Sequence, residues 1–209
     1  MSPKQPLREQ LRKIVLERVM KGVFPAGSRI VESALSAELG VSRTPLREAL
    51  LDLTKEGLLR SDLARGFTVR PLTAREVQEM YPILWTLECL ALRMAQDTPD
   101  FSELDDLNDQ LLQAKGEPVS ALEIDFHWHD LLIAGCLNQR LHEMIADLKK
   151  TIRRYEYSFM WDAELIHRSH VQHQEIIAAL KQKDIELASQ LLETHWRTGM
   201  SSLMEQITI

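Results

Sequence analysis

The sequence lacks any apolar run near the ~20 residues that a bilayer-spanning helix needs. Its first residues, MSPKQPLREQLRK, carry charges with no apolar segment after them, so we expect no signal peptide. Only two cysteines occur, Cys89 and Cys136, and they form no CxxC pair. This fits a reducing compartment and argues against a disulfide framework. We therefore expect a cytoplasmic protein with no membrane partner.

The charge is acidic overall but unevenly distributed along the chain. The net charge of −6 by itself argues against a nucleic-acid partner. However, residues 1–70 contain 13 Lys+Arg and 8 Asp+Glu, whereas residues 71–209 contain 12 and 23. A small basic segment before a larger acidic one predicts two domains with separate tasks. The first is suited to a polyanion such as DNA.

Residues 1–71 predict a winged helix-turn-helix domain. Apolar residues at helical spacing predict a helix over 6–21, and glycines close two further short helices over 32–40 and 41–57. Residues 58–70 predict two short strands joined by a turn. This order of elements is typical of winged helix-turn-helix domains, whose second paired helix enters the major groove.

Residues 72–209 predict an all-α helical bundle, so the whole protein is expected to be mainly α. Thr73 and Glu76 form a capping box that begins the first helix of this domain. Strand-like alternation is missing from this half of the sequence. The expected helices span residues 73–96, 101–115, 119–135, 138–160, 163–182 and 184–206.

Cationic and hydroxyl side chains gather at the start of the helix over 41–57. Arginines there oppose the helix dipole, so a negative partner is expected at this end. Ser42 and Thr44 can donate to phosphates. Arg43 and Arg47 can reach phosphates or the O6 and N7 atoms of guanine. On helix spacing alone, a purely structural or protein-binding helix pair remains an alternative.

The acidic domain contains a candidate metal site. Asp125 and His129 lie four residues apart and share one helix face. His173 and His195 lie in register with apolar stripes on two later helices. One carboxylate and three imidazoles that converge between helices suit a divalent transition metal. The alternative is that these histidines are hydrogen-bonded core residues.

The first domain resembles the DNA-binding domain of GntR-family bacterial transcription regulators. The match covers about residues 6–72 and includes VFPAGSRIVESALSAELGVSRTPLREALLDLTKEGLLRSDLARGFTVRPLT. The resemblance implies DNA contacts by Ser33, Arg43, Thr44, Arg47 and Gly66. From the hairpin tip, the neighbouring Arg65 can place a cation in the minor groove.

The second domain resembles the FCD ligand-sensing domain of the FadR-type branch of that family. The motif is DFHWHDLLIAGCLN, followed by HQEIIAALKQKDIELASQLLETH. The resemblance implies that Asp125, His129, His173 and His195 bind one divalent metal ion. Zinc is the expected metal, with nickel and manganese as alternatives. It also implies a small-molecule effector at the metal, such as an organic acid.

Together these matches predict a transcription regulator that binds a palindromic double-stranded DNA operator as a homodimer. Repression released by a metabolite is the expected mode, because most members of the family it resembles are repressors. A helical, hydrolase-like metalloenzyme that uses the Asp/His site is the alternative. The sequence has no HExxH motif and no obvious general base beside the ligands. A third possibility is a regulator whose metal is only structural.

Overall fold

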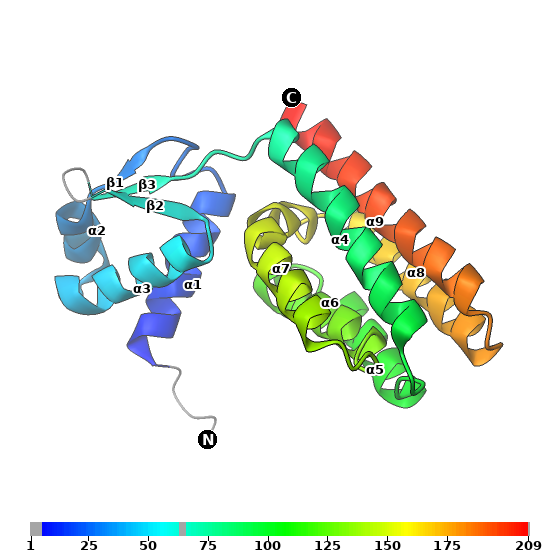
Figure 1. The fold of residues 1–209 in the computed structure, drawn as a ribbon. Helices are drawn as coiled ribbons and strands as arrows, with labels where there is room; N and C mark the ends of the chain where they lie inside the picture. The colour runs from blue at the N-terminus through cyan, green and yellow to red at the C-terminus, as the bar shows by residue number, and fades with distance from the viewer. Residues whose placement is uncertain (1–5, 63–65, 209) are drawn as a thin grey trace, which may run out of the picture. The chain divides into compact units, whose positions relative to one another are not determined.

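The structure is a computed structural model that describes residues 6–62 and 66–208. The chain divides into two compact units, Met1–Leu72 and Thr73–Ile209 (Figure 1). The first unit combines helices with a small sheet, and the second is built from helices. The mainly α fold predicted from the sequence is confirmed.

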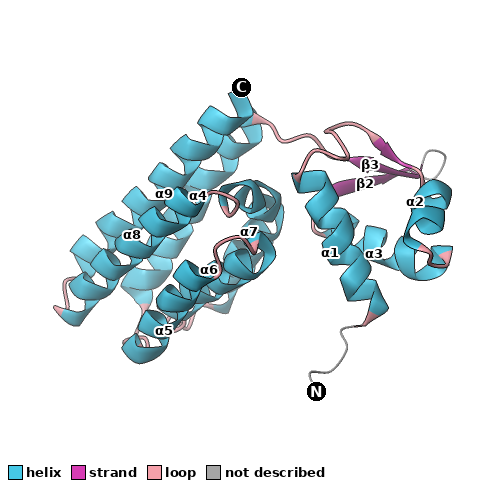
Figure 2. Cartoon of the chain, turned by 180° about the vertical axis from the view of Figure 1, so that it is seen from behind, coloured by secondary structure: helices cyan, strands magenta, loops and turns pink. Residues whose placement is uncertain are grey.

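The first unit has the helix and strand order of a winged helix-turn-helix. Its elements are α1 (Leu7–Met20), β1 (Arg29–Ile30), α2 (Glu32–Leu39), α3 (Arg43–Lys55), β2 (Leu59–Asp62) and β3 (Gly66–Val69). Helix α3 packs on α1 through a buried stripe that includes Leu46 and Leu50. The antiparallel sheet, magenta in Figure 2, has the order β1-β3-β2. The predicted two-strand hairpin was therefore incomplete, because Arg29 and Ile30 add a third strand by pairing with β3.

The second unit is the expected helical bundle. Its helices are α4 (Ala74–Met94), α5 (Phe101–Gln113), α6 (Pro118–Leu132), α7 (Gln139–Phe159), α8 (Ala163–Lys181) and α9 (Ile185–Thr208). Helix α4 packs against α7 and α9, while α8 packs against α5 and α9 (Figure 1). Helices α5 and α6 also pack together. Side chains from α4, α5, α6, α8 and α9 therefore meet inside one bundle.

Helix α4 begins at the predicted cap, but the capping box is only half formed. The Thr73 hydroxyl accepts a hydrogen bond from the Glu76 N–H at 3.2 Å. The Glu76 side chain turns to α7, where Arg154 and the Tyr155 hydroxyl donate to it. Tyr155 also accepts from the Thr73 N–H at 3.2 Å. Tertiary contacts with α7 thus replace the second half of the local cap.

Candidate DNA-binding surface and metal centre

The predicted DNA-contacting residues on α2 and α3 lie at the surface of the first unit. Ser42 is the N-cap of α3 and has extended backbone angles, and its side chain makes no capping hydrogen bond. Arg43, Thr44 and Arg47 follow it with exposed side chains, while the buried stripe of α3 faces α1. Ser33 is exposed on α2. Helix α3 thus buries its leucines and presents its polar first turns to solvent.

Of the two hairpin residues predicted to contact DNA, the structure describes Gly66. Gly66 begins β3 with φ +77°, a left-handed conformation that is strained for residues with a side chain. It pairs with Asp62 of β2, so it lies at the hairpin end of the sheet. Arg65 lies outside the described residues.

The three predicted histidine ligands come together in the interior of the second unit, and Asp125 lies beside one of them. Helix α6 carries Asp125 and His129, α8 carries His173, and α9 carries His195, and all four residues are buried. One ligand nitrogen from each histidine lies within 4.8 Å of the others. Asp125 Oδ1 lies 3.8 Å from His173 Nε2. The bundle therefore brings together side chains that are up to 70 residues apart in sequence.

In each of the three imidazoles, Nδ1 lies within hydrogen-bond distance of a side-chain oxygen atom, and this contact orients the ring. The pairs are His129 with Glu88 Oε2 at 3.0 Å, His173 with Asn108 Oδ1 at 3.1 Å, and His195 with Gln172 Oε1 at 3.0 Å. Because a neutral imidazole has one N–H, donation from Nδ1 leaves the lone pair on Nε2. This is the usual way in which outer residues orient metal-binding histidines.

The inner atoms of this cluster are acceptors that face one another. His129 Nε2 and His195 Nε2 lie 3.3 Å apart, and in these tautomers neither nitrogen carries a proton. Among the described residues, His173 Nε2 and Asp125 Oδ1 have no hydrogen-bond partner although both are buried. Each unsatisfied buried acceptor costs about 1–3 kcal/mol. A divalent cation would satisfy these acceptors, so the donor set fits a transition metal such as zinc.

Burial sets the charge of these groups. It lowers the pKa of His195 to about 3 and that of His173 well below its usual value, and neighbouring imidazoles lower both further. Both are therefore neutral near pH 7, which is the metal-binding form. Burial also raises the pKa of Asp125 to about 6, and the nearby ammonium group of Lys149 opposes that rise.

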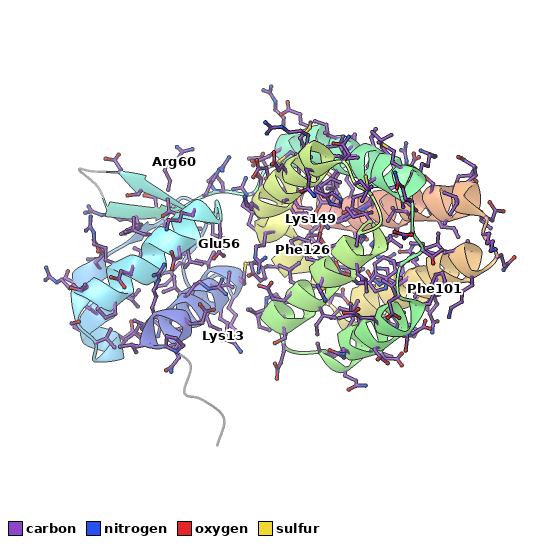
Figure 3. The ribbon with its side chains drawn as sticks, turned by 60° about the horizontal axis from the view of Figure 1, so that its bottom comes forward. Lys13, Glu56, Arg60, Phe101, Phe126 and Lys149 are labelled. Carbon is purple, nitrogen blue, oxygen red and sulfur yellow. The ribbon has the colours of Figure 1, made fainter. Side chains whose placement is uncertain are left out.

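Glu88 connects the cluster to a buried lysine. Its Oε2 accepts from the Trp196 indole at 2.7 Å and from His129, and its Oε1 lies 2.9 Å from Lys149 Nζ. Burial alone would raise the pKa of Glu88, but Lys149 and His129 outweigh it and hold the pKa well below its usual value. Lys149 extends over the ring of Phe126, 5.6 Å from its centroid (Figure 3). Glu88 is therefore an ionised carboxylate that holds His129 in place.

Sequence reasoning did not find the groups that orient the histidines. Asn108 was detectable in principle, because it lies four residues after Leu104 on the buried stripe of α5. Gln172 immediately precedes His173, but nothing in the sequence shows that it meets His195. His127 is exposed, with its Nε2 atom 3.7 Å from Glu103 Oε1, so it lies outside the cluster.

Comparison with known proteins gives the family. The chain matches "Bacterial regulatory proteins, gntR family" over residues 7–69 and "FCD domain" over residues 79–198. It is 34% identical to the HTH-type transcriptional regulator YdhC of Bacillus subtilis, over 90% of this chain and 84% of that protein. It is 28% identical to the HTH-type transcriptional repressor RspR of Escherichia coli, over 93% and 88%. A crystal structure of a GntR transcriptional regulator from Rhodococcus aligns with a TM-score of 0.69 and 25% identity, covering 95% and 97% of the two chains.

Among the described helices, none combines the length and apolarity that crossing a membrane requires. The matched families and relatives are DNA-binding transcription regulators, which removes the support for a metalloenzyme. The chain belongs to the gntR family of bacterial regulatory proteins, carries an FCD domain after its winged helix-turn-helix, and is a transcriptional regulator rather than an enzyme.

Proposed function

We propose that this regulator represses transcription from a palindromic double-stranded DNA operator, and that a small-molecule effector at a metal centre in the FCD domain controls its binding. One observation carries the proposal: three buried imidazoles are oriented so that their unprotonated Nε2 atoms face one another. Repression is supported by the relative RspR, which is named a repressor. We place this activity in the cytoplasm, where the operator is accessible.

The proposed DNA contacts divide into positioning and base-reading groups. Hydroxyls and backbone N–H groups position the domain on phosphates, and arginines read base edges. The residues assigned to this surface are Ser33, Ser42, Arg43, Thr44, Arg47, Arg65 and Gly66. A winged helix buries a small area on DNA, and a palindrome presents two equal half-sites. A homodimer with its two-fold axis on that of the operator fits both facts.

The proposed metal ligands are Asp125, His129, His173 and His195, with zinc favoured over nickel or manganese. A bound divalent metal supplies coordination positions for the oxygens of an effector such as an organic acid. The protein's part is to keep His173 and His195 neutral and to orient all three imidazoles through hydrogen bonds on Nδ1. The buried surroundings, with their low dielectric constant, strengthen the attraction between the site and a charged effector.

Operator binding with and without metal tests this proposal. Fluorescence anisotropy on a palindromic operator would be measured for metal-loaded protein, chelator-treated protein and the His173→Ala variant, each against a panel of small organic acids and sugars. We expect at least one compound to weaken operator binding by the metal-loaded parent and by metal-loaded His127→Ala, but not by chelator-treated protein or His173→Ala. His127→Ala is the matched control, because that histidine is exposed and lies outside the cluster. If an effector acts equally on all forms, the metal is not its receptor.

A further inference from the structure

We propose that Glu32 is a specificity-determining residue that holds the guanidinium of Arg47 in position to read a base. The inference rests on the proposed contact between Arg47 and DNA. Glu32 is the first residue of α2, and Arg47 lies in the N-terminal half of α3. The two residues therefore join the two helices of the helix-turn-helix at its polar surface.

The contact between these residues uses one end of the guanidinium. Arg47 Nη1 donates to both carboxylate oxygens of Glu32, at 3.2 and 3.3 Å. The Glu32 side chain is 20% exposed, whereas that of Arg47 is 59% exposed. The Arg47 guanidinium carbon also lies 5.9 Å from the centroid of the buried Phe67 ring. Arg47 is thus held by a carboxylate on α2 and an aromatic ring on β3.

The remaining donors of Arg47 suit a base contact. A guanidinium has five N–H donors in a rigid plane, and Glu32 takes those of Nη1. The Nε and Nη2 edge is left for the O6 and N7 atoms of guanine, which accept two parallel hydrogen bonds. By contrast, no side-chain partner holds Arg43 within the described part of the chain. Of these two α3 arginines, Arg47 alone is pre-oriented by a neighbouring acid.

Glu32 raises specificity by two physical effects. A guanidinium fixed before binding loses less rotational freedom when it meets the correct base. The carboxylate also repels phosphates, so it weakens complexes in which Arg47 meets only the DNA backbone. Both effects favour the operator over unrelated DNA. Removing the carboxylate should therefore strengthen non-specific binding while it weakens discrimination.

The test compares Glu32→Gln with Glu38→Gln in the full-length protein. Glu38 lies on the same helix, is more exposed, and pairs with Arg18 at 2.8 Å, so its substitution removes the same charge without touching Arg47. Affinities for the operator, for operators with single base-pair changes and for unrelated DNA would be measured at matched salt. We expect Glu32→Gln to lower the specificity ratio about tenfold, chiefly at one base pair, the size of one lost bidentate contact. Glu38→Gln should leave the ratio unchanged.

Two further variants separate geometry from charge. Glu32→Asp keeps the charge but shortens the reach, so it should lower the ratio without the rise in non-specific affinity. In the Glu32→Asp, Arg47→Ala double variant, which keeps the carboxylate charge, the ratio should equal that of Arg47→Ala alone, because the reach of Glu32 matters only through Arg47. A further loss in the double variant would overturn the inference.

The variant Arg47→Ala shows whether a negative result refutes the proposed DNA contact of Arg47 or only the role of Glu32. If it binds the operator like the parent, the proposed DNA contact is wrong and the inference falls with it. If it binds weakly while Glu32→Gln matches Glu38→Gln in its ratio, the DNA contact stands and the role of Glu32 is refuted. Thermal melting of each variant checks that the substitution leaves the fold intact.

Discussion

Replacing Asn108 with leucine should weaken metal binding without removing a metal ligand. The buried Asn108 side chain makes two hydrogen bonds, accepting from His173 Nδ1 at 3.1 Å and donating to the His170 carbonyl at 3.0 Å. Leucine has a similar size and can make neither bond. The His173 Nδ1–H is left unpaired at about 1–3 kcal/mol, whereas the His170 carbonyl lies inside α8 and keeps its backbone partner, so the metal-free protein should lose about 1–3 kcal/mol of its free energy of unfolding. Loss of an orienting group typically lowers metal affinity about 10–100-fold.

Chelator competition and denaturant unfolding would measure these two effects separately. Gln110→Leu is the matched control, because Gln110 lies exposed on the same helix and its substitution adds the same apolar group. The control should keep the metal affinity and unfolding free energy of the parent. If Asn108→Leu binds metal as tightly as Gln110→Leu, His173 does not depend on Asn108 for its orientation. The reasoning from the hydrogen-bond network would then be wrong.

The other predictions concern DNA, assembly and pH. Arg47→Ala should cost at least about tenfold in operator affinity through one lost contact, and equal affinity at matched salt would count against it. Light scattering at micromolar concentration should show a homodimer, whereas a monomer with 1:1 operator binding would exclude this arrangement. Burial raises the pKa of Glu156 to about 8, although the Tyr81 hydroxyl that donates to it opposes this. Folded protein thus holds a proton that unfolded protein releases above pH 4.5, so the free energy of unfolding should fall between pH 4.5 and about 8. Denaturant unfolding of Glu156→Gln should show a flatter dependence, and an identical slope would refute this assignment.

The helices were predictable because their signals are local. Two such signals are apolar residues at helical spacing and a glycine that ends the helix, such as Gly40. Both can be read from neighbouring positions in the sequence. The two-residue strand Arg29–Ile30 was missed as a strand because two residues are too few to show alternation. Glu76 was expected to complete a cap, but Arg154 and Tyr155 of α7 bind it instead. Such a contact depends on how two distant helices pack.

The difference between local signals and tertiary contacts also explains what could be predicted of the metal centre and the DNA-binding surface. The spacing of Asp125 and His129 is visible in sequence because both lie on one helix. The contact of Gln172 with His195 joins two helices, and that of Glu32 with Arg47 joins residues 15 positions apart. Neither pair leaves a periodic signal. Sequence patterns therefore predict candidate ligands, while the groups that orient them emerge from tertiary structure.

Elemental analysis of the purified protein tests the central claim most directly. The parent would be purified without chelator, offered excess zinc, nickel or manganese, and desalted beside His173→Ala and His127→Ala. We predict one divalent ion per chain in the parent and in His127→Ala, and loss of that ion in His173→Ala. If the parent retains no stoichiometric divalent ion, the buried imidazoles are packed core residues and the proposed metal-dependent sensing is wrong.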